Sequence, residues 1–279
     1  MLKLAAFADE ISPELDVQIE HLKQNGITHV ELRGVAGKNV LDFDPALRRQ
    51  VKTEFGDNGL GVACIGSPIG KVKLNESFEQ HFERFKIAVE LAEYFDAPYI
   101  RIFSYYPAEG TTHADLVAKG RDEVLRRMQR QVDYLKGRTL VLVHENEAKI
   151  YGEKGAQCRD LHRTIKSDKF KAAFDFANFV QAKENPLDNW PLLKPYTAHI
   201  HIKDALLANG KVVPAGQGEG HIAEILKDAT ASGYNGFLTL EPHLAAHGQF
   251  AGFSGPDLFK TAVDALRAVC RENGIQLAS

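Results

Sequence analysis

Four apolar segments of the chain each end in a residue that can bind a metal ion. The run at 140–143 leads through His144 to Glu145, and later runs end in Asp175, His201 and Glu241. Three carboxylates and one imidazole suit a hard or borderline divalent cation, and a donor set without a thiolate argues against structural zinc. The pattern predicts one site for Mn²⁺ or Mg²⁺, which Co²⁺ or Zn²⁺ could also occupy.

A simpler interpretation exists for each of these residues taken alone. An acidic residue at the end of a strand is more often a loop anchor or half of an ion pair than a metal ligand. Three carboxylates brought together without a cation would, however, repel one another strongly. Four candidate ligands at the ends of four successive segments therefore favour the metal site.

Eight apolar segments alternate along the chain with eight segments of helical periodicity. The expected strands are 3–8, 28–32, 60–65, 99–103, 140–147, 171–176, 197–202 and 237–240. The expected helices are 13–25, 44–55, 77–95, 112–135, 159–167, 186–193, 221–232 and 256–272. Strict alternation of this kind indicates a parallel sheet.

Eight strand–helix units in 279 residues predict an α/β fold, a single-domain (β/α)8 TIM barrel over 1–279. An open doubly wound sheet is the alternative, but no GxGxxG motif follows the first strand. In a barrel all C-terminal strand ends meet at one face. Strands five to eight would therefore place Glu145, Asp175, His201 and Glu241 around one point.

Composition excludes several classes of partner. The net charge of −3 gives no electrostatic case for nucleic acid or an anionic membrane. No apolar stretch approaches the ~20 residues that span a bilayer, and the short apolar run at 1–8 is expected to be a strand and not a signal peptide. Cys64, Cys158 and Cys270 are scattered, which suits a reducing compartment. A cytoplasmic location is expected.

Several motifs together resemble the xylose isomerase-like TIM-barrel superfamily, in its branch of sugar phosphate isomerases and epimerases. That branch includes ketose 3-epimerases, hydroxypyruvate isomerase and inosose dehydratase. The resemblance covers essentially the whole chain. The motifs lie at 144–146 (HEN), 174–178 (FDFAN), 199–204 (HIHIKD), 213–220 (VPAGQGEG) and 233–243 (GYNGFLTLEPH).

The resemblance implies a metal-dependent isomerase or epimerase of a small carbohydrate. It implies that Glu145, Asp175, His201 and Glu241 bind one divalent metal ion, and that Glu145 and Glu241 also move the substrate proton. The metal would hold a carbonyl oxygen and the adjacent hydroxyl and stabilise an enediolate. Members of the family are often dimers or tetramers, so a homo-oligomer is possible.

Two residues depart from the family pattern. Asn178 stands where epimerases carry a histidine that contacts substrate, and asparagine can bind a hydroxyl but cannot titrate near neutral pH. Glu147 stands where several relatives have histidine. Either difference could mean another substrate or another reaction. A lyase that dehydrates a keto-sugar or keto-inositol is therefore the alternative function.

Other residues are candidate substrate contacts. Lys203 could bind an oxyanion, and His243 and Arg101 could also reach substrate. His199 is expected to be an interior residue. The glycine-rich segment 216–220 could bind phosphate through its N–H groups or simply form a tight turn.

The two acids at the ends of strands one and two also have two possible roles. Glu10 and Glu31 could line the pocket or pair with Arg33. A nuclease similar to endonuclease IV would need further histidine ligands, which strands three and four lack at their ends, and a non-catalytic binding barrel is a last alternative.

Overall fold

The computed structural model describes residues 1–245 and 253–278, and it contains a closed barrel of eight parallel strands. In order around the barrel the strands are β1 (Lys3–Ala6), β12 (Phe237–Leu240), β9 (Thr197–Ile202), β8 (Phe170–Asp175), β7 (Val141–Glu145), β6 (Tyr99–Ile102), β5 (Gly61–Ile65) and β2 (His29–Leu32). The predicted single-domain (β/α)8 barrel is confirmed, and each expected strand lies within a few residues of an observed one.

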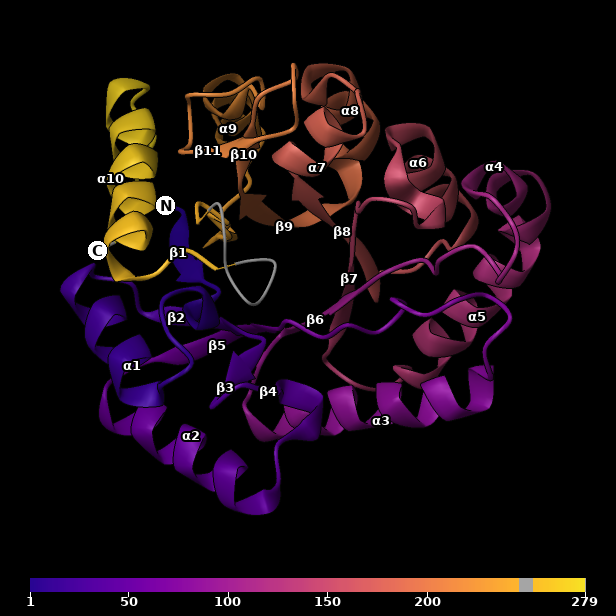
Figure 1. The fold of residues 1–279 in the computed structure, drawn as a ribbon, viewed down its shortest axis with the longest axis horizontal. Coiled ribbons are helices and arrows are strands. Elements are labelled where there is room, and N and C mark those ends of the chain that lie inside the picture. The colour runs from indigo at the N-terminus through magenta and orange to yellow at the C-terminus, as the bar shows by residue number, and fades with distance from the viewer. Residues whose placement is uncertain (246–252, 279) are drawn as a thin grey trace.

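Helices surround the barrel on the outside (Figure 1). The larger ones are α1 (Leu15–Gln24), α2 (Pro45–Asp57), α3 (Phe78–Tyr94), α5 (Arg121–Tyr134), α6 (Gly155–Thr164), α8 (Pro186–Leu193), α9 (Ile222–Ala231) and α10 (Pro256–Glu272). Shorter elements are α4 (His113–Asp115), α7 (Phe176–Gln181) and the two-stranded ribbons β3 (Gly34–Val35) with β4 (Lys38–Asn39) and β10 (Asp204–Ala205) with β11 (Val212–Val213).

Local sequence signals fix several helix ends. Asp44 caps α2, because its Oδ1 accepts hydrogen bonds from the N–H groups of Ala46 and Leu47, and Pro45 follows at the first helical position. Ser77 caps α3 in the same way, by accepting from the N–H of Gln80. Apolar residues at helical spacing then turn one face of each helix toward the barrel.

Three expected helices differ from the observed ones, two in their bounds and one in its interior. The first helix begins at Leu15 and not at 13, because Ser12 accepts a bond from the N–H of Glu14 in the preceding turn. The helix expected at 112–135 contains a π-helical turn at Leu116–Gly120. The helix expected at 159–167 runs from Gly155 to Thr164. Helix α7 is an addition that periodicity does not reveal, since it has only six residues.

The barrel interior changes from apolar to polar along its axis. Ala5, Ala63 and Phe237 pack together near the N-terminal ends of the strands, and the main apolar core lies between barrel and helices. Two residues further along a strand, the side chain returns to the same face. His199 and His201 on β9 are therefore both fully buried, as expected for His199. The charged residues collect at the C-terminal ends.

Two further expectations concern membrane-spanning segments and the cysteines. Among the residues that the structure describes, no helix has both the length and the apolar content to cross a membrane. Cys64, Cys158 and Cys270 are buried and form no disulfide.

His81 on α3 ties that helix to the mouth of the barrel. Its Nε2 accepts a hydrogen bond of 2.8 Å from the N–H of Gly70, and the carbonyl of Gly70 accepts from the N–H of Tyr105 beyond β6. A side chain at Gly70 would collide with the backbone of Phe103 at 2.0 Å. The loop after β5 is thus held between α3 and β6.

We predict that His81 makes the fold sensitive to acid. Burial, with help from the charge of Arg127, lowers the pKa of His81 from 6.5 to about 4. The folded protein then binds fewer protons than the unfolded chain, so the contribution is intact above pH 6.5 and is lost as pH falls toward 4. Each pKa unit corresponds to ~1.4 kcal/mol. On acidification, the free energy of unfolding should therefore fall by about 3 kcal/mol less in His81→Gln than in the wild type.

Urea unfolding at neutral and acidic pH measures this difference. Glutamine keeps an acceptor for the Gly70 N–H but does not titrate. The control is His21→Gln at a half-exposed position of α1, which should follow the wild type. Equal pH dependence of His81→Gln and the wild type would contradict the prediction.

Candidate metal and active site

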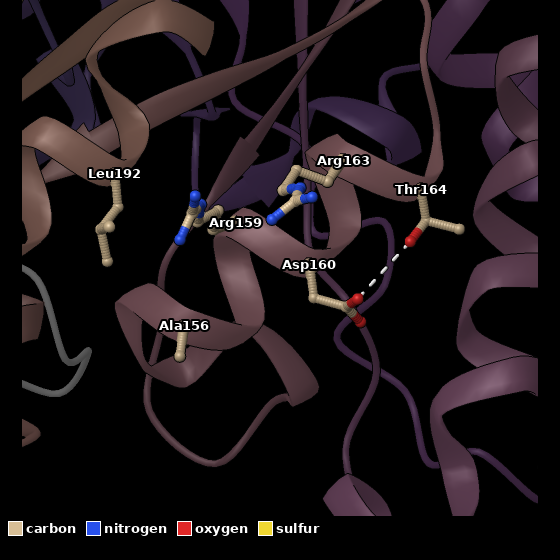
Figure 2. A pocket seen from close by; sticks show the side chains of 6 residues that line it. All are labelled: Ala156, Arg159, Asp160, Arg163, Thr164 and Leu192. Carbon is tan, nitrogen blue, oxygen red and sulfur yellow. Dashed lines mark hydrogen bonds between the residues drawn. The ribbon is translucent and has the colours of Figure 1, made fainter.

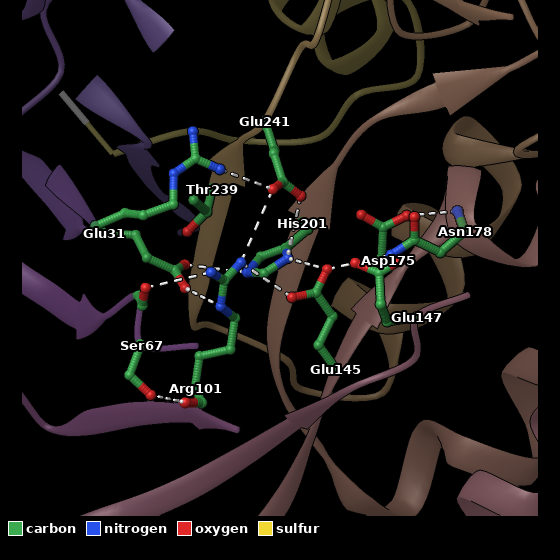
Figure 3. A network of polar contacts seen from close by, with 12 residues as sticks. Glu31, Ser67, Arg101, Glu145, Glu147, Asp175, Asn178, His201, Thr239 and Glu241 are labelled. Atoms are coloured by element: carbon green, nitrogen blue, oxygen red, sulfur yellow. Dashed lines mark hydrogen bonds and ion pairs between the residues drawn. The ribbon is translucent and has the colours of Figure 1, made fainter. Parts of the chain in front are cut away.

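The four predicted ligands meet at the C-terminal end of the barrel. Each of Glu145, Asp175, His201 and Glu241 offers one atom, and these atoms all lie within 4.8 Å of one another. All four residues are buried, and Figure 3 shows their side chains converging from β7, β8, β9 and the end of β12. The strand register thus brings together residues that are as much as 96 positions apart (241 − 145) in the chain.

Two buried atoms of this cluster make the donor set suitable for a cation. His201 Nδ1 lies 3.3 Å from Glu145 Oε1 and 3.6 Å from Glu241 Oε2, without hydrogen-bond geometry to either. Asp175 Oδ2 also makes no hydrogen bond to the residues that the structure describes, although it faces Lys203. Both atoms therefore face into the cluster, where a bound cation would replace their contacts with charged neighbours. Oxygen-rich sites with one imidazole suit Mn²⁺ or Mg²⁺.

The other oxygen of Asp175 holds the local backbone in place. Asp175 Oδ1 caps α7 by accepting a hydrogen bond of 2.7 Å from the N–H of Asn178. Asn146 donates from Nδ2 to the carbonyl of Asp175 at 2.9 Å and accepts from its N–H at 3.0 Å. Asn146 therefore joins the ends of β7 and β8. The sequence placed it in a motif but gave no indication of this contact.

Three basic side chains lie between the carboxylates. Arg101 Nη1 is 3.1 Å from Glu145 Oε2 and 3.8 Å from Glu241 Oε1. Arg33 Nη1 is 3.3 Å from Glu241 Oε1. Lys203 Nζ is 3.2 Å from Glu241 Oε2 and 3.0 Å from Asp175 Oδ2. Arg101 and Lys203 were expected near substrate, and their cationic groups do face the cluster.

The three carboxylates differ in how easily they ionise. Burial favours the neutral acid, but the charges of His201 and Arg101 outweigh it and lower the pKa of Glu145 to about 2. Burial is likewise outweighed at Glu241, where Lys203 and other cations hold the pKa well below its usual range. At Asp175 burial, together with the charges of Glu241 and Glu145, outweighs the opposing charge of Lys203 and raises the pKa to about 7.

The remaining candidate substrate contacts lie around this cluster. Asn178 donates both N–H bonds of its side chain, to Glu145 Oε1 at 3.2 Å and to the carbonyl of Asn146 at 2.8 Å. Glu147 pairs with Lys71 at 2.8 Å, where both side chains are partly exposed. Asn178 therefore orients Glu145, while Glu147 is at the more open edge.

His243 lies at the other edge, beside an acid from the first strand unit. Its Nε2 is 3.0 Å from Glu10 Oε1 and 3.4 Å from Glu241 Oε1. Burial is outweighed by these two carboxylates, which raise the pKa of His243 to about 9. Glu10 also faces Arg33 at 3.7 Å, so it both lines the site and pairs with Arg33, the two roles expected for it.

The glycine-rich loop is occupied by a carboxylate of the protein itself. Asp204 accepts hydrogen bonds from the N–H groups of Gly216, Gly218 and Gly220 at 2.8 to 3.0 Å. These are the donors that a phosphate group would require. The structure therefore supports the tight-turn interpretation of segment 216–220 and not the phosphate site.

A separate hollow of about 390 Å³ lies on the outer wall of the barrel along α6 (Figure 2). Its lining residues are Ala156, Arg159, Asp160, Arg163, Thr164 and Leu192. The carboxylate of Asp160 is already bound by Arg121 and by the hydroxyl of Tyr151. None of the four candidate ligands lines this hollow, so it is distinct from the chemical site.

Comparison with known proteins supports the assignment of the fold. The family model described as the xylose isomerase-like TIM barrel matches residues 19–269. No curated protein shows a significant match to the chain.

Solved structures of similar proteins cover nearly the whole chain. The probable 3-DHS dehydratase AsbF from Bacillus anthracis is 18% identical with a TM-score of 0.74, over 95% of this chain and 99% of that one. The 3-keto-D-glucoside 4-epimerase YcjR from E. coli is 14% identical with a TM-score of 0.73, over 97% and 98%. A xylose isomerase-like TIM barrel protein from Mycobacterium smegmatis, in complex with magnesium, is 16% identical with a TM-score of 0.69, over 96% and 97%.

We predict that Asp204 is needed to hold the glycine-rich loop. Asp204→Ala removes the acceptor for three backbone N–H groups, and hydrogen bonds to a charged group are worth about 1.5–3 kcal/mol each. Amide hydrogen exchange at Gly216, Gly218 and Gly220 should therefore be at least tenfold faster in the variant.

The control is Glu219→Ala in the same loop. Glu219 accepts one hydrogen bond, from the N–H of Leu207, so its loss should leave the exchange of the three glycine amides near the wild-type rate. Inorganic phosphate should not slow that exchange in the wild type. Protection by phosphate would contradict the role assigned to Asp204.

Proposed function

Since this chain belongs to the xylose isomerase-like TIM barrel family, we propose that it is a divalent-metal-dependent isomerase or epimerase of a small sugar or sugar derivative. The observation that carries the proposal is the convergence of Glu145 and Glu241 with Asp175 and His201 on one buried point. Two carboxylates from different strands can there face one substrate carbon.

Glu145, Asp175, His201 and Glu241 would hold the metal ion, which is Mn²⁺ or Mg²⁺ in this proposal, with Co²⁺ or Zn²⁺ as alternatives. When bound, the ion would supply Lewis-acid chemistry that stabilises the negative charge developing on the substrate during proton removal. One of the solved relatives is in complex with magnesium. His201 Nδ1 and Asp175 Oδ2, which face the cluster without a hydrogen bond to the described residues, support the same use here.

The two glutamates would move the proton. The low pKa values of Glu145 and Glu241 mean that both are ionised at neutral pH, so either can accept a proton from the carbon next to a carbonyl. Glu145 is the last residue of β7 and Glu241 follows β12, with β8 and β9 between these strands in the barrel. Removal of the proton by one glutamate and its return by the other would invert the configuration at that carbon. Return of the proton to the neighbouring carbon would instead isomerise the sugar.

Five residues around the carboxylates would bind and orient the substrate. Lys203 and Arg101 offer buried cationic donors to oxygen atoms. Asn178 keeps Glu145 in position by its hydrogen bond of 3.2 Å. Glu147 and His243 lie at the partly exposed edges of the cluster, where they can contact hydroxyl groups.

The proposed partner is a small carbohydrate and not nucleic acid or a membrane, in keeping with the net charge of −3. The protein is proposed to work in the cytoplasm, and a homo-oligomer is compatible with the family.

A lyase acting on a keto-sugar or keto-inositol is the second candidate. The ammonium group of Lys203 lies 3.2 Å from Glu241 Oε2, so an acid that could protonate a departing hydroxyl is next to a base that could remove the proton. The solved relative AsbF is itself described as a probable dehydratase. A net loss of water from the substrate, seen by mass spectrometry, would select this candidate.

We predict that the protein binds one divalent ion through Asp175. A ligand at 100 times its dissociation constant stabilises the folded state by about 2.7 kcal/mol, so Mn²⁺ should raise the Tm of the wild type by several degrees. Asp175→Asn should abolish the rise. Glu147→Gln, which removes a nearby carboxylate outside the ligand set, is the control. An unchanged rise in Asp175→Asn would refute the proposed site.

We predict exchange of a substrate hydrogen with solvent. The wild type with Mn²⁺ or Mg²⁺ in D₂O should incorporate deuterium next to the carbonyl of at least one compound in a panel of ketoses, inososes and their phosphates. Glu145→Gln and Glu241→Gln should each lower the rate by about 10²- to 10⁴-fold, the usual contribution of an acid or base.

The readout is NMR or mass spectrometry of the recovered compounds. A matched control is Glu219→Gln, an exposed glutamate of the glycine-rich loop, which should keep the wild-type rate. Exchange that survives in both Glu145→Gln and Glu241→Gln would rule out their assigned role.

A further inference from the structure

We infer that Glu31 is a positioning residue, which fixes the orientation and the tautomer of His201 so that Nδ1 faces the metal site. The inference rests on the proposed function, because it assigns His201 as a ligand. It adds a residue from β2, which is separated from β9 by β1 and β12 around the barrel, to those that determine metal affinity.

The contact between Glu31 and His201 is short and fully buried. Glu31 Oε2 lies 3.0 Å from His201 Nε2, and both residues have no exposed surface. The register of β2 against β5 shifts between Val30 and Glu31. Bulges of this kind re-aim a side chain, and here Glu31 is directed across the barrel interior toward β9.

The chemistry of the imidazole ring then determines which nitrogen can bind a cation. A carboxylate only accepts hydrogen bonds, so the Nε2 that faces Glu31 must carry the proton. Nδ1, on the other side of the ring, faces Glu145 and Glu241, the two carboxylates with which it would share a bound cation in place of a proton. A hydrogen bond from the remote nitrogen of a ligand histidine to a carboxylate fixes its tautomer and makes it a better donor to the metal.

Neighbouring contacts hold Glu31 itself in place. His199 Nε2 lies 2.8 Å from the same Oε2 atom and 2.9 Å from the hydroxyl of Thr239. Arg101 Nε lies 3.8 Å from Glu31 Oε1, while its Nη1 reaches Glu145. Glu31 therefore contacts two histidines and one arginine and is held by them, which leaves it little freedom to move.

A different use of the same atoms must be separated from this one. Glu31, His199 and His201 could themselves hold an ion, since their ligand atoms lie within 4.8 Å of one another. Such an ion would bind His201 Nε2 and displace the proton that the inference places there. A second bound metal ion per chain that disappears in His199→Gln would therefore overturn it.

The first test measures the affinity of Mn²⁺ by isothermal titration in Glu31→Gln. Loss of a carboxylate that supports a ligand histidine typically weakens metal binding 10- to 100-fold, and we expect a loss of about that size. Glu147→Gln is the control, because it also removes one negative charge near the site but contacts Lys71. It should stay within about threefold of the wild type, as expected for a partly exposed ion pair.

The outcomes separate this inference from the proposed function. If the wild type binds Mn²⁺ and both Glu31→Gln and Glu147→Gln lose affinity equally, Glu31 acts only through its charge. That result would overturn this inference but not the proposed function. No binding by the wild type would overturn both.

A second readout uses the wild-type protein and therefore does not require that Glu31→Gln folds. Nitrogen-15 NMR of the wild type with Mg²⁺ should show one protonated Nε2 for His201 and no proton on its Nδ1, with His199→Gln used to assign the signals. The opposite tautomer would overturn the inference. In Glu31→Gln, if circular dichroism shows it folded, the signals of His201 should change while those of the partly exposed His21 and His221 stay the same.

Discussion

Buried carboxylates at the C-terminal end of the barrel impose a requirement for nearby positive charge. Glu10, Glu31, Glu145, Asp175 and Glu241 are all buried there, and an unpaired buried ion costs several kcal/mol. The structure meets the requirement with cationic side chains from three other positions. Those side chains are Arg33, Arg101 and Lys203. The positions of the carboxylates in the site therefore depend on the cationic side chains that lie between them.

The same cations also connect the site to the apolar body of the protein. The guanidinium of Arg101 lies over the rings of Phe7 and Phe103, at 4.8 and 5.0 Å from their centres. It also donates to the carbonyl of Gly66 at 3.2 Å. Packing and charge therefore hold one group in one place, so a glutamate that contacts it, such as Glu145, is held as well.

Side-chain bonds to the backbone fix the ends of the strands in the same manner. Asn146 exchanges two hydrogen bonds with the backbone of Asp175, and Asp204 binds three N–H groups of the following loop. A ligand that must be placed to within a fraction of an ångström needs such a rigid surrounding. The polar residues of the motifs thus serve two purposes, since some face the cluster and others hold its loops.

The sequence alone determined the barrel and the four candidate ligands, because strand periodicity, helix caps and strand-end residues are local signals that each segment carries. It could not determine which groups Glu31 contacts, since 170 positions separate it from His201, nor that Asp204 fills the glycine-rich loop. The start of α1 and the π-helical turn before α5 also escaped prediction. Such features depend on which side chains tertiary packing brings within bonding distance, and pairing between distant residues leaves no periodic pattern in the chain.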